Sequence, residues 1–365
     1  MSRIKFLEAH FYDWDKDRRR IQRRLDRFLK ERYALARGAL RPDPDDEQDW
    51  LRWESDLLLS SLDRAAQDRV DRRASRLADR RAAAAGLSHL KREDRHSLEV
   101  LRNGVSLIRV RSEHQADEIA AGIHGGMPWM APATDLLWKF MRRSVRNGDA
   151  GFRLPPVLLD GPPGIGKSIW ARQLSAALGV PRCGVEATVE QASFGILGSQ
   201  RGWANPQPGR PLLTILQSLV ANPVVVVDEV EKAGVATSTK GNSFGLAEGL
   251  LSLLEPSSAA SWQCPYYQVR FDMSWISWVL TSNTCATLPA PLLSRLEVIH
   301  LPPVPISDLV AFAWREGGKR GLTEASVEAV AEALAAAGRG AELNLRHVNR
   351  MLTRGEALER AAVLH

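Results

Sequence analysis

Gly161-Pro162-Pro163-Gly164-Ile165-Gly166-Lys167-Ser168 carries the clearest structural signal in this chain. It matches the phosphate-binding pattern G-x-x-x-x-G-K-[ST] at every fixed position. The glycines let backbone N–H groups close around phosphate oxygens, while the lysine can reach the β- and γ-phosphates and the serine can ligate Mg²⁺. We therefore predict that every residue of this stretch contributes to a nucleotide site, with Lys167 also acting in catalysis and Ser168 as a metal ligand.

The residues on either side fit a strand, a loop and a helix. Val157-Leu158-Leu159 is a short apolar run that predicts a buried strand. Apolar residues then recur at helical spacing from Ser168 to Leu178, and Gly179 follows as a stop signal. This order directs the N–H groups of a helix amino terminus toward an anion. A tight glycine turn in some other α/β protein is the alternative.

The bulk properties predict a sizeable core and no membrane segment. The chain has 365 residues, 44% of them hydrophobic, which suggests two or three domains. No apolar run approaches the ~18 residues that cross a membrane, and the first residues lack the apolar stretch of a secretory signal. The cysteines lie far apart in the sequence and fit no metal-ligand spacing: Cys183, Cys264 and Cys285. We expect a cytoplasmic protein with reduced thiols and no membrane contact.

The net charge of +6 raises the question of a nucleic-acid partner. Much of the excess arginine lies before residue 100, where Asp and Glu are interspersed with it. This mixture favours a solvated helix surface with ion pairs, and nucleic acid stays open as the alternative.

Two long amphipathic helices are expected in the same region. Apolar residues recur at near-heptad spacing from Ile4 to Phe28, and Pro42–Glu47 interrupts the pattern. A second apolar stripe predicts a helix from Asp49 through Ala83. Together they predict a basic helical hairpin region over residues 1–100. An apolar stripe predicts that one face of a helix is buried, but not which surface covers it. A partner-docking module and a helical domain packed on itself are therefore both possible interpretations.

Short apolar runs alternate with helical segments over residues 101–302. Val224–Val227, Trp278–Thr281 and Val298–Leu301 predict buried strands. Such alternation predicts an α/β domain with a parallel sheet and helices on both faces. Residues 303–365 are almost entirely helical and predict a small helical lid domain.

Polar residues follow these strands. Asp228 and Glu229 follow Val227, at the sheet edge where open parallel sheets bind ligands. We predict that Asp228 holds Mg²⁺ and that Glu229 polarises an attacking water. Asn283 follows the next strand and can bond the γ-phosphate or orient that water. Arg295, just before the last strand, is predicted to stabilise charge on a neighbouring subunit's γ-phosphate. An acidic turn and a surface arginine are the ordinary alternatives.

This combination resembles the AAA+ ATPases, a family of P-loop NTPases, and within it the ATPase domain of Lon proteases. The resemblance spans Pro155 to Arg350. Its most specific pieces are Gly161–Ser168, Asp228–Lys232, Leu253–Pro256, Thr281–Thr284 and Pro291–Leu301. It implies ATP hydrolysis with ATP and Mg²⁺ as ligands, and a helical lid after the sheet. The roles it implies are the first Walker motif at Lys167 and Ser168, the second at Asp228 and Glu229, sensor 1 at Asn283, the arginine finger at Arg295, and the nucleotide-contacting sensor 2 arginine at Arg346.

The resemblance also implies a mechanism. Related ATPases form rings, here expected to be homo-hexamers, and carry an aromatic residue on a loop that lines the central pore. Trp203 stands in the corresponding place and could grip an extended protein substrate by its flat apolar face. Packing of Trp203 under a loop is the alternative.

Two departures from Lon proteases shape the expected function. Lon proteases continue past the lid into a peptidase domain, whereas this sequence stops at His365, and its first hundred residues do not look like a Lon substrate-binding domain. We therefore expect a stand-alone ring ATPase that remodels or unfolds proteins. The competing hypotheses are a nucleic-acid-associated motor or loader and a nucleotide-gated scaffold with negligible turnover.

Overall fold

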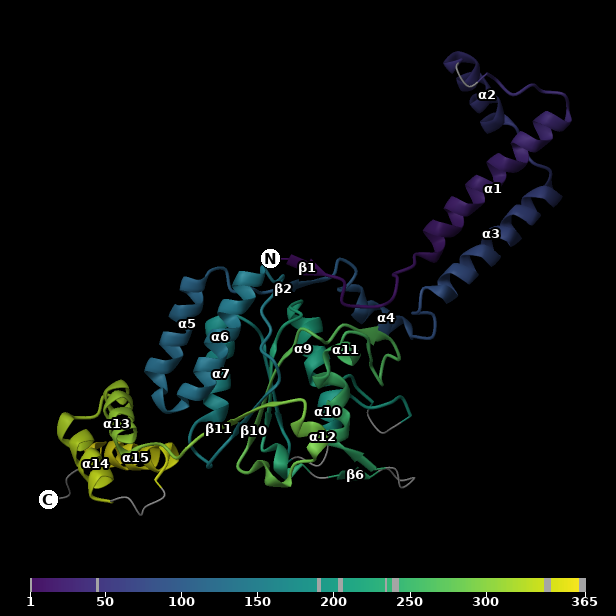
Figure 1. Ribbon diagram of the computed structural model, residues 1–365. Helices are drawn as coiled ribbons and strands as arrows, with labels where there is room; N and C mark the ends of the chain where they lie inside the picture. Colours follow the sequence, from purple (N-terminus) through teal and green to yellow (C-terminus); the bar gives the residue numbers. More distant parts are fainter. Residues whose placement is uncertain are drawn as a thin grey trace. The chain divides into compact units, whose positions relative to one another are not determined.

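The computed structural model divides the chain into two compact units (Figure 1). One comprises Glu8–Arg102, and the other comprises Met1–Leu7 together with Asn103–His365. The described residues are 2–43, 46–188, 192–202, 206–233, 235–237, 243–337 and 343–360.

A five-stranded parallel sheet forms the centre of the larger unit. Its strands are β3 (Val157–Asp160), β4 (Arg182–Glu186), β5 (Val224–Asp228), β10 (Ser277–Ser282) and β11 (Glu297–His300). They lie in the order β11-β3-β10-β5-β4, and every neighbouring pair is parallel. Because parallel strands point the same way, the residues that follow each strand meet at one edge of the sheet. The predicted parallel sheet is confirmed.

Helices cover both faces of this sheet, as expected for a parallel sheet whose strands are buried on both sides. Figure 1 shows α5, α6 and α7 on one face, and α9, α10, α11 and α12 on the other. Trp170 on α7 is fully buried, and its indole Nε1 donates to Thr134 Oγ1 on α6 at 3.0 Å. The elements that accompany the sheet are α5 (Glu113–Gly126), η1 (Pro128–Met130), α6 (Ala131–Asn147), α7 (Lys167–Leu178), α8 (Ala192–Leu197), α9 (Arg210–Ser218), η2 (Val230–Lys232), α10 (Leu246–Leu254), α11 (Pro256–Ala259), η3 (Cys285–Thr287) and α12 (Ala290–Leu293).

Three small antiparallel pairs join the same unit. They are β1 (Ser2–Ile4) with β2 (Val105–Leu107), β6 (Val235–Thr237) with β7 (Ser243–Gly245), and β8 (Trp262–Gln263) with β9 (Arg270–Phe271). The expectation of a helix from Ile4 is wrong at its start, because Ile4 pairs with Val105. Phe6 is likewise buried, and its ring centroid lies 5.5 Å from that of Phe271. The first helix begins only at Trp14, capped by the Asp13 carboxylate.

The smaller unit consists of four helices, α1 (Trp14–Ala36), α2 (Glu47–Leu59), α3 (Arg64–Ala84) and α4 (Arg92–Glu99). α1 packs on α3 around Ile21, Ala74 and Ala78. The single helix expected over Asp49–Ala83 is instead two helices. The break has a local cause, since Ser60 adopts an extended backbone and the Asp63 side chain caps the next helix by accepting from Ala66 N at 2.6 Å.

The lid consists of α13 (Ile306–Arg320), α14 (Glu324–Ala336) and α15 (Leu345–Arg360). It contacts the phosphate loop directly, because Leu345 N donates to Gly164 O at 3.2 Å. Arg315 on α13 also donates to the last carbonyls of α5, those of Gly125 at 3.2 Å and Gly126 at 2.6 Å. Among the residues described, no helix is both long and apolar enough to cross a membrane.

Candidate nucleotide site

The phosphate loop connects β3 to α7 in a conformation that only glycine accepts at key positions. Gly161 lies against Leu301, the residue that follows β11, and an added Cβ would come within 2.5 Å of Leu301 O. Gly166 has φ +96°, and a Cβ there would lie 2.6 Å from Met127 Cε. Trp129 supports the loop from beneath by donating from Nε1 to Ile165 O at 2.8 Å. The loop is therefore held in shape by its neighbours.

Lys167 begins α7 and turns its ammonium back over the loop. Its Nζ donates to the carbonyls of Gly161 and Pro162, and to Asn283 Oδ1 at 3.1 Å. Burial lowers the pKa of Lys167, and the nearby carboxylates of Glu231 and Asp160 oppose that effect. The cation therefore sits in a partly desolvated position, where it interacts more strongly with a phosphate than it would in water.

Asp228 ends β5 beside the serine of the loop. Ser168 Oγ donates to Asp228 Oδ1 at 2.7 Å, and Thr281 Oγ1 donates to the same oxygen at 3.0 Å. The two donors come from α7 and β10, so three elements fix the position of this carboxylate. A hydroxyl and a carboxylate placed together are ligands that Mg²⁺ accepts.

Glu229 has a backbone conformation that is uncommon for a residue with a side chain, with φ 55°. Its N–H donates to Thr281 Oγ1 at 3.1 Å, which fixes the turn. The Lys232 ammonium lies 3.0 Å from Glu229 Oε2 and is the main cause of a lowered pKa of Glu229. Asn283 and Arg346 lower the pKa further. This carboxyl group is therefore ionised at neutral pH and lines the same cavity as Lys167 and Asn283.

Asn283 is oriented from behind by Glu231. Glu231 Oε1 accepts from Asn283 Nδ2 at 2.9 Å and from Asn283 N at 3.1 Å. With its amide nitrogen held there, Asn283 presents Oδ1 toward Lys167. Glu231 therefore acts as a positioning residue for the asparagine.

These groups surround one cavity of about 360 Å³ between the sheet edge and the lid. The sequence-predicted residues that line it are Pro163, Gly164, Gly166, Lys167, Ser168, Asp228, Glu229, Asn283 and Arg346. Arg346 reaches the cavity from α15, so the lid contributes one wall.

Four of the predicted site residues do not line this cavity: Gly161, Pro162, Ile165 and Arg295. Arg295 Nη1 donates to Pro291 O at 2.8 Å, and its Nε lies 3.7 Å from Glu255 Oε2. Trp203 falls outside the described residues.

Sequence reasoning missed several members of the site. Thr281 joins Asp228 to Glu229, and Glu231 holds the asparagine. Glu186 and Thr188 also line the cavity, at and beyond the end of β4. Each of these lies in the last two residues of a strand or shortly after one, at the same sheet edge. Polar residues at the carboxyl ends of predicted strands are the sequence signal that indicates them.

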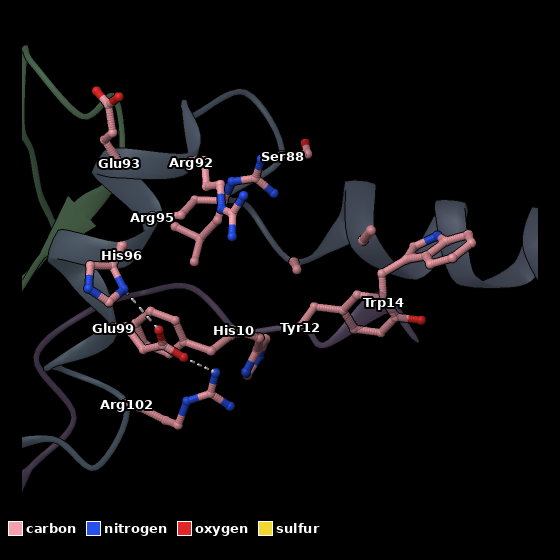
Figure 2. A pocket seen from close by; sticks show the side chains of 14 residues that line it. His10, Tyr12, Trp14, Ser88, Arg92, Glu93, Arg95, His96, Glu99 and Arg102 are labelled. Atoms are coloured by element: carbon pink, nitrogen blue, oxygen red, sulfur yellow. Dashed lines mark hydrogen bonds and ion pairs between the residues drawn. The ribbon is translucent and has the colours of Figure 1, made fainter. Parts of the chain in front are cut away.

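The smaller unit has a separate cavity of about 870 Å³ between the segment His10–Trp14, the end of α3 and α4 (Figure 2). Aromatic side chains of His10–Trp14 form one wall. Figure 2 shows Arg92 and Arg95 beside this hollow, and Glu99 bound by His96 at 3.5 Å and by Arg102 at 2.7 Å. The wall is therefore mixed aromatic and cationic.

Comparison with known proteins agrees with the geometry of the nucleotide site. Residues 157–303 match the family described as "ATPase family associated with various cellular activities (AAA)". The chain is 30% identical over 284 residues to a Lon protease of Desulfovibrio desulfuricans, covering 76% of this chain and 30% of that protein. It is 36% identical over 177 residues to a Lon protease of Magnetococcus marinus, which covers 48% of this chain and 21% of that protein. It is 34% identical over 159 residues to the peroxisomal Lon protease homolog 2 of Spinacia oleracea, which covers 44% of this chain and 17% of that protein.

The chain thus spans less than a third of the length of each of these relatives. The similarity nevertheless includes the sheet and the whole phosphate loop. This chain therefore contains an ATPase domain of the AAA family and is related over that region to Lon proteases.

Proposed function

We propose that this chain hydrolyses ATP as one subunit of a cytoplasmic homo-hexameric ring and uses the energy to remodel protein substrates. One observation carries the proposal: a single cavity collects Lys167, Asp228, Glu229, Asn283 and the lid's Arg346. These supply a cationic contact for phosphate, a metal ligand, a base and a polar orienting group, which are the functions that phosphoryl transfer requires.

Each group has a role that follows from its position. Glu229 accepts the proton of a water that attacks the γ-phosphorus, and the bond to the β,γ-bridging oxygen breaks to release ADP. Asn283 orients that water, while Lys167 and Arg346 stabilise charge on the phosphate oxygens. Ser168 and Asp228, whose oxygens are 2.7 Å apart, would hold Mg²⁺, which neutralises phosphate charge when bound.

Hydrolysis is tested by Glu229→Gln. This variant should bind ATP with near wild-type affinity but lose at least ~100-fold in turnover, because the base is gone while the phosphate contacts remain. Steady-state phosphate release and equilibrium binding of a fluorescent ATP analogue measure the two effects. Turnover that stays near wild type would refute the role of Glu229.

The position of Arg295 supports the proposed ring. Its guanidinium is anchored to Pro291 and Glu255 outside the cavity of its own chain, where a neighbouring subunit could receive it. Arg295→Ala and Lys167→Ala subunits should each be inactive alone, and mixtures should regain activity, since a mixed ring contains some sites with an intact lysine and an intact arginine. No recovery at any ratio would argue against a shared site.

A protein substrate is proposed because Trp203 is expected to line the pore of such a ring. Glu229→Gln subunits with bound ATP should retain an unfolded, labelled substrate protein, and the added change Trp203→Ala should release it. Trp314→Ala is a matched control, because Trp314 is an exposed tryptophan on α13 that does not line the nucleotide cavity. Equal retention by both double variants would refute a grip by Trp203.

We propose that the smaller unit docks a protein partner rather than nucleic acid. Many of its cations are already engaged by acids, as Asp17 with Arg20 and Arg81, and Arg27 with Glu54. The cavity beside Arg92 and Arg95 combines aromatic walls with positive charge and suits an acidic peptide segment with an apolar side chain.

Polarisation assays can separate the two partner classes. A labelled Glu- and Phe-containing peptide should bind, and Arg95→Glu should abolish that binding, whereas Arg72→Glu on α3 should not, because Arg72 does not line the cavity. A labelled oligonucleotide whose binding falls steeply with salt would instead favour the nucleic-acid hypothesis.

A further inference from the structure

Three metal-ligating side chains meet next to the phosphate loop, although they lie far apart in the sequence. Asp160 is the last residue of β3, and His300 is the last residue of β11. These two are direct partners in the strand register. Cys285 begins η3, just beyond the end of β10, which is the other neighbour of β3. Adjacent strand ends thus bring a carboxylate, an imidazole and a thiol to one place.

The distances between the ligand atoms of these three residues are close to those found around a bound cation. One ligand atom from each of Asp160, Cys285 and His300 can be chosen so that all lie within 4.8 Å of one another. His300 Nδ1 is 3.0 Å from Asp160 Oδ2. Ligands of a tetrahedral Zn²⁺, at bonds of about 2.0–2.3 Å, lie roughly 3.3–3.8 Å apart, so small side-chain movements would suffice.

A second observation points to a missing ligand. The other carboxylate oxygen, Asp160 Oδ1, is buried and has no hydrogen-bond partner among the described residues. A buried carboxylate oxygen without a partner is costly, and a bound cation or water is the usual way to satisfy it.

We propose that Asp160, Cys285 and His300 form a site for a borderline-soft divalent cation of the Zn²⁺ type. A thiolate and an imidazole select such ions, whereas Mg²⁺ and Ca²⁺ prefer oxygen ligands. Three protein ligands leave a fourth position for water. The site is distinct from the one at Ser168 and Asp228, which offers oxygen atoms alone.

The position of the site gives it a structural consequence. Gly161 of the phosphate loop follows Asp160 directly, Asn283 lies two residues before Cys285, and Arg295 lies five residues before His300. A cation bound by all three ligands therefore ties together the segments that carry the loop, the asparagine and the arginine.

The test uses the full-length, tag-free protein under reducing, anaerobic conditions, with Co²⁺ as the probe. Wild type should bind Co²⁺ stoichiometrically and show the near-ultraviolet absorption of a cobalt–thiolate bond. Cys285→Ser should lose that absorption, and His300→Ala should weaken Co²⁺ binding by more than about tenfold. Zn²⁺ should displace Co²⁺ and should raise the Tm of wild type but not of His300→Ala.

Two matched variants separate this site from others in the chain. Cys183→Ser removes a different buried thiol and should keep the absorption. Asp228→Ala removes a ligand of the nucleotide site and should keep it as well. If wild type shows no cobalt–thiolate absorption, or if the absorption survives in Cys285→Ser, the proposal is wrong. Circular dichroism confirms that each variant is folded, and His300→Gln replaces His300→Ala if the latter is not.

Discussion

Thr281 joins the two acids of the nucleotide site, and its hydroxyl gives the sharpest stability prediction. The side chain is only 2% exposed. Its Oγ1 donates to Asp228 Oδ1 at 3.0 Å and accepts from Glu229 N at 3.1 Å. Thr281→Val keeps the shape of the side chain and removes both hydrogen bonds.

The expected loss follows from those two contacts. A hydrogen bond to a charged group contributes about 1.5–3 kcal/mol, and an unpaired buried N–H costs about 1–3 kcal/mol. Because Asp228 keeps Ser168 as a donor and is partly exposed, we expect a net loss of about 2–4 kcal/mol in the free energy of unfolding. Glu229 is also released from its strained turn, so ATP turnover should fall.

The neighbouring Ser282 provides a matched control. It is fully buried, and its Oγ has no hydrogen-bond partner among the described residues. Ser282→Ala therefore removes a hydroxyl from the same strand at little cost, or with a gain in stability. Urea denaturation of the nucleotide-free proteins, followed by circular dichroism, compares the two. Equal destabilisation of Thr281→Val and Ser282→Ala would refute this account of the Thr281 hydroxyl.

Three further changes test other contacts of the site. Gly166→Ala should lower the Tm and weaken ATP binding, because a backbone φ of +96° costs a residue with a side chain about 1–2 kcal/mol. An unchanged Tm and an unchanged ATP affinity would contradict the role given to the backbone of the phosphate loop. Lys232→Met removes the contact that lowers the pKa of Glu229, so the pKa of Glu229 should rise toward 4.5. The acidic limb of the pH–rate profile should then move to higher pH, and an unchanged limb would contradict the role of Glu229 as the base. Arg315→Leu removes two hydrogen bonds between the lid and α5 and should speed proteolytic cleavage before α13, whereas Lys319→Leu on the same helix should leave the cleavage rate unchanged.

The parallel sheet and the phosphate loop could be predicted because their signals are local. Buried parallel strands appear as short apolar runs, as at Val224–Val227, and the loop needs glycine at fixed spacing. Helix limits were less predictable. Ile4 belongs to a strand because Val105, about a hundred residues away, pairs with it, and the break at Ser60–Asp63 depends on an aspartate cap within an otherwise continuous apolar stripe.

Local sequence was therefore enough to identify the ATPase motifs and four of the five strands of the sheet. It did not identify β4, because Arg182–Glu186 alternates polar and apolar residues and contains no apolar run. The order of the strands across the sheet is a property of the tertiary structure alone, and that order decides which strand ends become neighbours. It brings Thr281 to Asp228 and places Glu231 behind Asn283. It also gathers Asp160, Cys285 and His300, whose spacing in the sequence carries no metal signal, because side chains coordinate through space and not along the chain.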